Sequence, residues 1–256
     1  MKFLKRGFKE TLEAVKQNKL QVIGLFLLQI FFIILLIYVT MIYSVKIING
    51  IQQVIEPVQQ VNYGDDQQDI FNQLYPIYES YAQLKGNLLG FAGWLAGLFL
   101  VFQGLLWTLS HKVIGARKLG KILVKYLVTT SLGILLFVLL AYSVLSSITI
   151  DNLKMPLIVL GIVSLLMYFL FINFLAFLNT DNWKGYFRRV LSNLKKIQYS
   201  LLVFAINIIL LGMFTYLIYL GRNYFLLGSL STAILVVLLV LSRIFWISCL
   251  NEKNNH

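Results

Sequence analysis

Acidic, histidine and cysteine side chains are scarce in this sequence, which has ten Asp and Glu residues, two His residues and one Cys. Metal sites need several such side chains close together. His111 and His256 are far apart in the sequence and have no acidic or cysteine partner at motif spacing. Because Cys249 is the single cysteine, no disulfide can form within the chain. We therefore expect no metal site and no cofactor.

Motifs for nucleotide binding and nucleophilic catalysis are also missing, since the sequence has no P-loop and no Gly-x-Ser-x-Gly turn. The segment Asp65-Asp66-Gln67-Gln68-Asp69 has DDxxD spacing and resembles the magnesium–diphosphate motif of prenyl-chain enzymes. That resemblance implies a divalent cation that bridges carboxylates and phosphate. The sequence contains no second acidic cluster. We interpret this segment as a solvated turn and expect the protein not to be an enzyme.

Long apolar runs dominate the sequence, in which 59% of residues are hydrophobic and 12% are charged. A hydrocarbon core about 30 Å thick is crossed by a helix of about 20 apolar residues. Six runs are long enough: Val22–Val45, Leu88–Leu109, Ile122–Ile148, Leu157–Leu178, Leu201–Leu220 and Leu226–Trp246. Their continuity differs from the alternation of a β-barrel. We predict an all-α polytopic membrane protein, with residues 1–256 as one domain of six transmembrane helices.

The charges between the runs indicate the orientation. With the N-terminus in the cytosol, 18 of the 22 basic residues lie on the cytosolic side and six of the ten acidic residues lie outside. The positive-inside rule then predicts that both termini are cytosolic, and we place the protein in the plasma (cell) membrane. The first run is too long for a signal-peptide core, so we interpret it as an uncleaved anchor. The net charge of +12 indicates orientation and attraction to anionic lipids at the cytosolic face, not nucleic-acid binding.

No Asp, Glu, Lys or His lies near the middle of a predicted span, whereas proton relays and ion-coupled transporters need such groups. We expect Arg243 and Lys125 to snorkel to the cytosolic interface. Four amides remain inside the spans: Gln29, Gln103, Asn173 and Asn207. They either form hydrogen bonds between helices or line a polar chamber, open to the cytosolic leaflet, for a lipid headgroup or small solute. The equal depth of Gln29 and Gln103 is compatible with both interpretations.

The second span carries the strongest motif, a series of glycines at spacings of 4, 3, 4 and 7: Gly86, Gly90, Gly93, Gly97 and Gly104. In a regular α-helix these positions fall within about 60° of arc. A surface without side chains lets another helix approach closely, which drives helix packing in lipid. We predict that the stripe packs within the chain, with dimerisation and a permeation path as the alternatives.

Two basic segments have apolar residues at helical spacing and resemble each other at an offset of 179 residues. The first is a cytosolic amphipathic helix over residues 1–20, and the second precedes the fifth run. Both are typical of helices that lie in the membrane interface. A weaker segment, 110–121, suggests a three-fold repeat of 1–110, 111–180 and 181–256. The alternative is that cytosolic loops of membrane proteins are commonly basic and amphipathic.

The long loop 46–86 has apolar residues at helical spacing on both sides of a turn-like cluster at residues 62–66. We predict an extracytosolic helical hairpin that continues the first two spans, with its two apolar stripes packed together. Pro57 and Pro76 are expected to kink or interrupt its arms. The competing arrangement is a hairpin that lies flat, with Phe71, Tyr75 and the tyrosines after it at the headgroups.

These observations favour a non-catalytic membrane protein, either a scaffold or a subunit of a membrane assembly with a protein partner. The missing catalytic motifs and the glycine stripe lead to this interpretation. The alternative is a permease for a small or lipidic solute, suggested by the amides and the possible repeat. A membrane enzyme is the third possibility and depends only on the acidic turn.

Overall fold

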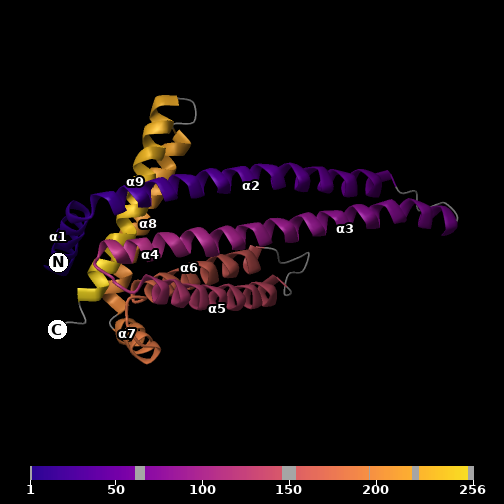
Figure 1. The fold of residues 1–256 in the computed structure, drawn as a ribbon. Helices are drawn as coiled ribbons and strands as arrows, with labels where there is room; N and C mark the ends of the chain where they lie inside the picture. The colour runs from indigo at the N-terminus through magenta and orange to yellow at the C-terminus, as the bar shows by residue number, and fades with distance from the viewer. Residues whose placement is uncertain (1, 61–66, 146–153, 196, 221–224, 253–256) are drawn as a thin grey trace. The chain divides into compact units, whose positions relative to one another are not determined.

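The computed structural model describes residues 2–60, 67–145, 154–195, 197–220 and 225–252. Every regular element in these ranges is a helix, as Figure 1 shows. The elements are α1 (Lys2–Gln17), α2 (Lys19–Gln60), α3 (Gln67–Leu98), the π-helical segment η1 (Phe99–Gln103), α4 (Gly104–Val113), α5 (Leu119–Leu145), α6 (Lys154–Ala176), α7 (Trp183–Lys195), α8 (Ile197–Leu220) and α9 (Phe225–Glu252). The predicted all-α class is confirmed.

Six of the described helical stretches are long and apolar enough to cross a membrane. They are Lys19–Pro57, Tyr75–Val113, Leu119–Leu140, Ile158–Ala176, Ser200–Leu217 and Gly228–Leu250. Each overlaps one of the six predicted runs. The chain is therefore a multi-pass helical membrane protein.

The chain forms two compact units, and residues 30–102 make up the smaller one. Within it, α2 and α3 run side by side as two long arms (Figure 1). Their shared core contains the buried side chains of Phe32, Val39 and Leu98. Farther along the arms, the rings of Tyr43 and Phe91 lie 5.5 Å apart. Aromatic side chains thus fill much of the space between the two helices.

The predicted hairpin region is helical in both arms. A Cβ atom on Gly50 would lie 3.1 Å from the side chain of Leu84, so the arms touch at this level. Pro57 and Pro76 both lie inside continuous helices, so of the two expected effects, a kink or an interruption, the interruption was wrong. A proline removes one backbone hydrogen bond, and each of these helices continues past that loss. The turn predicted at residues 62–66, which contains Asp65 and Asp66, lies outside the described residues.

The larger unit comprises residues 1–29 and 103–256. In it α9 packs against α1, α4, α6 and α8. Half of the α9 span is buried, compared with 28% or less of every other span. Tyr126, Tyr186 and Trp246 belong to its largest hydrophobic cluster and are almost fully enclosed. The large unit is thus organised around the helix that comes last in the sequence.

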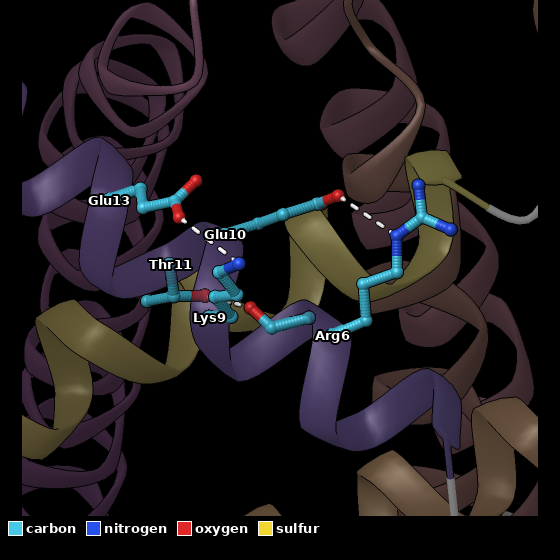
Figure 2. A network of polar contacts seen from close by, with 6 residues as sticks. Arg6, Lys9, Glu10, Thr11 and Glu13 are labelled. Atoms are coloured by element: carbon cyan, nitrogen blue, oxygen red, sulfur yellow. Dashed lines mark hydrogen bonds and ion pairs between the residues drawn. The ribbon is translucent and has the colours of Figure 1, made fainter.

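Helix α1 lies against α9 because Gly7 has no side chain. A Cβ atom at this position would be 2.2 Å from the Sγ atom of Cys249, which is itself fully buried. Thr11 lies on the same side of α1, and its hydroxyl donates to the Gly7 carbonyl at 2.8 Å (Figure 2). That bond satisfies the hydroxyl inside the interface. The face of α1 that contacts α9 therefore has small side chains, and its hydroxyl group is already hydrogen-bonded within the helix. Both properties suit close packing.

Helix α1 also carries two ion pairs, each between residues one helical turn apart (Figure 2). Arg6 Nε lies 3.7 Å from Glu10 Oε1, and Lys9 Nζ lies 3.9 Å from Glu13 Oε1. These side chains are exposed, and such pairs contribute at most a few tenths of a kcal/mol, roughly 0.3–0.5. They support the helix weakly, so packing on α9 must hold it in place.

We predict that Gly7→Ala destabilises the protein by about 1–3 kcal/mol, because the new methyl group overpacks against Cys249. The double variant Gly7→Ala/Cys249→Ala removes the sulfur and should recover most of that loss. Thermal unfolding in detergent measures both effects. The matched control is Gly120→Ala, where no atom lies within 4 Å of the new Cβ. A Gly7→Ala protein as stable as this control would contradict the packing.

Candidate functional site: a buried arginine and its amides

Arg243 lies on α9, seven residues before Leu250, where the α9 span ends. At 1.5 Å per residue this places its Cα atom about 10 Å inside the span. Only 8% of the residue is exposed. The expectation that Arg243 snorkels to the interface was therefore wrong. Its guanidinium is enclosed by protein because polar partners are available there.

Two predicted residues provide these partners. Nη2 of Arg243 donates to Oε1 of Gln29 at 2.8 Å and to Oε1 of Gln103 at 3.1 Å. The three side chains come from α9, α2 and η1, so one cation connects three membrane helices. Hydrogen bonds from a charged donor are stronger than those between neutral groups. The structure thus brings Gln29 and Gln103 together on one guanidinium group.

The local backbone helps to set the position of Gln103, which is the last residue of η1. A π-helix closes i→i+5 hydrogen bonds, holds more residues per turn than an α-helix, and is frequent at functional sites. It changes the rotational register of the residues after it. The spacing argument that aligned Gly104 with the earlier glycines assumed a regular α-helix and was wrong at this point. No sequence signal used above identified the π-helical segment.

The cluster keeps an uncompensated positive charge. The ion pairs among the described residues join other groups, and none involves Arg243. Its Nη1 atom is buried and has no hydrogen-bond partner there. Burying a cation whose only bonded partners are amides costs free energy. Packing alone therefore does not explain why an arginine occupies this position.

Asn173 belongs to a different cluster. Its side chain donates to the Phe169 carbonyl at 2.8 Å and accepts from Nδ2 of Asn193 at 2.8 Å. Asn193 also donates to Oγ of Ser200 at 2.8 Å. All three residues are buried. This network attaches α7 to the spanning helices α6 and α8, so the role of Asn173 in it is structural.

Asn207 bonds within its own helix, where Nδ2 donates to the Val203 carbonyl at 2.9 Å. By their hydrogen bonds to described residues, the four predicted amides therefore fall into three separate groups. Gln29 and Gln103 share Arg243, Asn173 joins the α7 network, and Asn207 bonds locally. Sequence reasoning did not include Arg243 in the site, because Arg243 is only three residues from Trp246, where the predicted run ends.

The five predicted packing glycines also differ in their surroundings. A Cβ atom on Gly90 would lie 3.0 Å from the hydroxyl of Tyr43, and one on Gly104 would lie 2.9 Å from the ring of Tyr126. Among the described residues, no atom lies within 4 Å of the Cβ position at Gly86, Gly93 or Gly97. Two of the glycines thus accommodate tyrosines of this chain, and three present open backbone.

His111 has a structural position, since its Nε2 lies 2.9 Å from the Leu175 carbonyl and the side chain is buried. The described part of the chain contains no group of three or more His, Cys, Asp or Glu that could hold a metal ion. Searches for similar proteins found no match among protein-family models, curated proteins or solved structures. The function must therefore be inferred from the chain itself.

We predict that Gln29→Leu/Gln103→Leu destabilises the protein by at least about 2 kcal/mol, because a buried charge loses both of its acceptors. Adding Arg243→Met removes the charge and should restore most of the stability. Thermal unfolding of the double and triple variants checks this. The control is Asn207→Leu, which removes only a bond within one helix. If the triple variant were no more stable than the double variant, the charge would not be the cause.

Proposed function

We propose that this protein is a non-catalytic scaffold or subunit of a membrane assembly, with another membrane protein as its partner. The observation that carries the proposal is the open backbone at Gly86, Gly93 and Gly97 on α3. Each glycine costs a helix about 0.8–1.0 kcal/mol relative to alanine. Close approach of a second helix offsets that cost in lipid.

The small amount of burial on this span supports the same proposal. Only 11% of the most apolar part of Tyr75–Val113 is buried. Apolar surface alone needs no partner in a bilayer, because lipid tails satisfy it. Three aligned glycines are different, since lipid tails gain little from a groove that suits a helix backbone. A helix from another chain is the occupant that fits this groove.

The two amphipathic helices support a proposed orientation in which both termini are in the cytosol of the cell. Helix α1 buries Gly7 and Thr11, and α7 buries Tyr186 and Val190 at the same offset of 179 residues. Next to these buried faces, both helices expose apolar side chains beside lysines and arginines: Phe8 and Leu12, and Phe187 and Leu191. An apolar edge beside basic residues suits the surface of an anionic bilayer.

This correspondence favours two related units more than three. Residues 114–118, at the place of the third interfacial segment, form a turn that leads directly into α5. We propose that α1 with α2 and α7 with α8 are the repeated pairs. Each pair has an interfacial helix followed at once by a spanning helix.

To test the partner, we would release the protein from its native membrane in mild detergent and weigh the intact particle by native mass spectrometry. We expect the wild-type particle to contain a constant second chain. Gly93→Leu should remove that chain, because its side chain fills the groove. Ala92→Leu adds bulk at an exposed neighbouring position and should keep the partner. A particle that contains only this chain, or equal behaviour of the two variants, would contradict the proposal.

A permease for a small or lipidic solute is the second candidate, and the polar cluster around Arg243 favours it. A permease needs a water-accessible path to Gln29 and Gln103. In a Cys249→Ala background, Gln103→Cys should then react with a charged thiol reagent that cannot cross the membrane. Leu25→Cys is the control. Leu25 is nearer than Gln29 to the start of α2, but it is fully buried, so the reagent should not reach a cysteine at this position. An unreactive Gln103→Cys would exclude this candidate.

A further inference from the structure

A cavity of about 380 Å³ lies between two turns of the large unit. The first turn joins α4 to α5, and the second joins α6 to α7. Its lining consists of residues 115–118 of the first turn, residues 178–181 of the second turn, and Lys121 and Ile122 near the start of α5. Three spans end beside it, at Val113, Leu119 and Ala176. The cavity is therefore at the membrane surface, where lipid headgroups are.

The charge of this cavity is positive. Arg117, Lys118 and Lys121 line it, together with the single carboxylate of Asp181. Lys118 Nζ lies 2.7 Å from Asp181 Oδ1, and this hydrogen-bonded ion pair holds the pKa of Asp181 below its usual range. Asp181 is thus ionised at neutral pH and neutralises Lys118. The charges of Arg117 and Lys121 are left for a ligand.

The backbone adds to this potential. Gly115 has a φ of +96°, a conformation that glycine adopts easily, and it lets the chain turn sharply after α4. Helix α5 begins four residues later, at Leu119. The N–H groups of its first turn have no partner within the helix and give that end a partial positive charge. Lys121 is in this first turn, so its ammonium and the helix end act on the same space.

Lys125 of α5, which is only 3% exposed, holds the second turn in place. Its Nζ donates to the Thr180 carbonyl and lies 5.9 Å from the centre of the Trp183 ring and 5.7 Å from that of Tyr186. Burial raises the pKa of Tyr186 to about 12, and its hydroxyl is 3.1 Å from that of Thr129. Tyr186 is therefore neutral, and the contact with Lys125 is a cation–π interaction. The cavity is held in shape without a ligand.

We infer that this cavity binds a phosphate group, carried either by a membrane lipid or by a water-soluble phosphate ester. Arg and Lys are the usual phosphate ligands of proteins, Arg by paired hydrogen bonds and Lys as a point charge. Basic pockets between membrane helices commonly hold lipid phosphates. The volume suits a phosphate with a small polar headgroup, and Ile122 and Leu178 provide an apolar wall for the adjoining carbon chain. The inference does not depend on the proposed subunit function.

The test uses the full-length protein purified in a neutral detergent. Phosphatidylglycerol, diacylglycerol and glycerol 1-phosphate are titrated separately, and bound molecules are counted by native mass spectrometry. The variant Arg117→Gln/Lys121→Gln removes the two available charges. The control Arg188→Gln/Lys184→Gln removes the same charges from exposed positions on α7, outside the cavity.

We expect wild type and control to bind phosphatidylglycerol equally and the cavity variant to bind it about tenfold or more weakly. Binding of phosphatidylglycerol without glycerol 1-phosphate identifies a lipid phosphate as the ligand. Equal binding of glycerol 1-phosphate identifies a soluble phosphate ester. Equal losses in both double variants would overturn the site, because surface charge alone would then explain the binding. Failure of the wild type to bind either phosphate probe, or equally strong binding of diacylglycerol, which has no phosphate, would also overturn it.

Discussion

The hydrogen bonds from Arg243 to Gln29 and Gln103 are the interaction on which the large unit depends most. They connect α9, α2 and η1 around a guanidinium that protein encloses almost completely. A charge in this position is tolerated only when its bonds are made, because the alternative is a guanidinium in hydrocarbon. The cost of misplacing Arg243 therefore fixes the rotation of all three helices. Apolar contacts alone would fix it less strictly, since they vary little as one helix rotates against another in lipid.

The remaining contacts of α9 follow from its central position. Gly7 lets α1 come close to Cys249 on one side, while Trp246 reaches the hydrophobic cluster on α6 and α8. The Asn173–Asn193–Ser200 network then attaches α7 to two spans. Small residues and satisfied polar groups hold both amphipathic helices. Such contacts can drive helix packing inside a membrane, where an apolar side chain gains little by moving from lipid to protein.

The sequence was sufficient to predict the helical class and the six spans, because apolar length depends only on bilayer thickness. It was also sufficient to single out Gln29 and Gln103, which the structure joins through Arg243. It did not predict Arg243 as their partner, since snorkelling and burial both fit an arginine near the end of a span. The difference depends on which helices are neighbours in space. The π-helical segment was missed because no pattern in the sequence marks it. The helices that continue through Pro57 and Pro76 show that a proline need not end a helix.

The two polar features of the large unit differ in how they neutralise charge. At the cavity near the membrane surface, Asp181 compensates one lysine, and water with its ions can screen the remaining cations. At Arg243 the partners are amides, which solvate the charge without cancelling it. A glutamate in place of either glutamine would neutralise the cluster but would add a second buried charge, whose desolvation the pairing need not offset. Two neutral acceptors avoid that second cost and leave one positive charge near the end of α9. If that end faces the cytosol, the charge favours the same orientation as the basic segments between the spans.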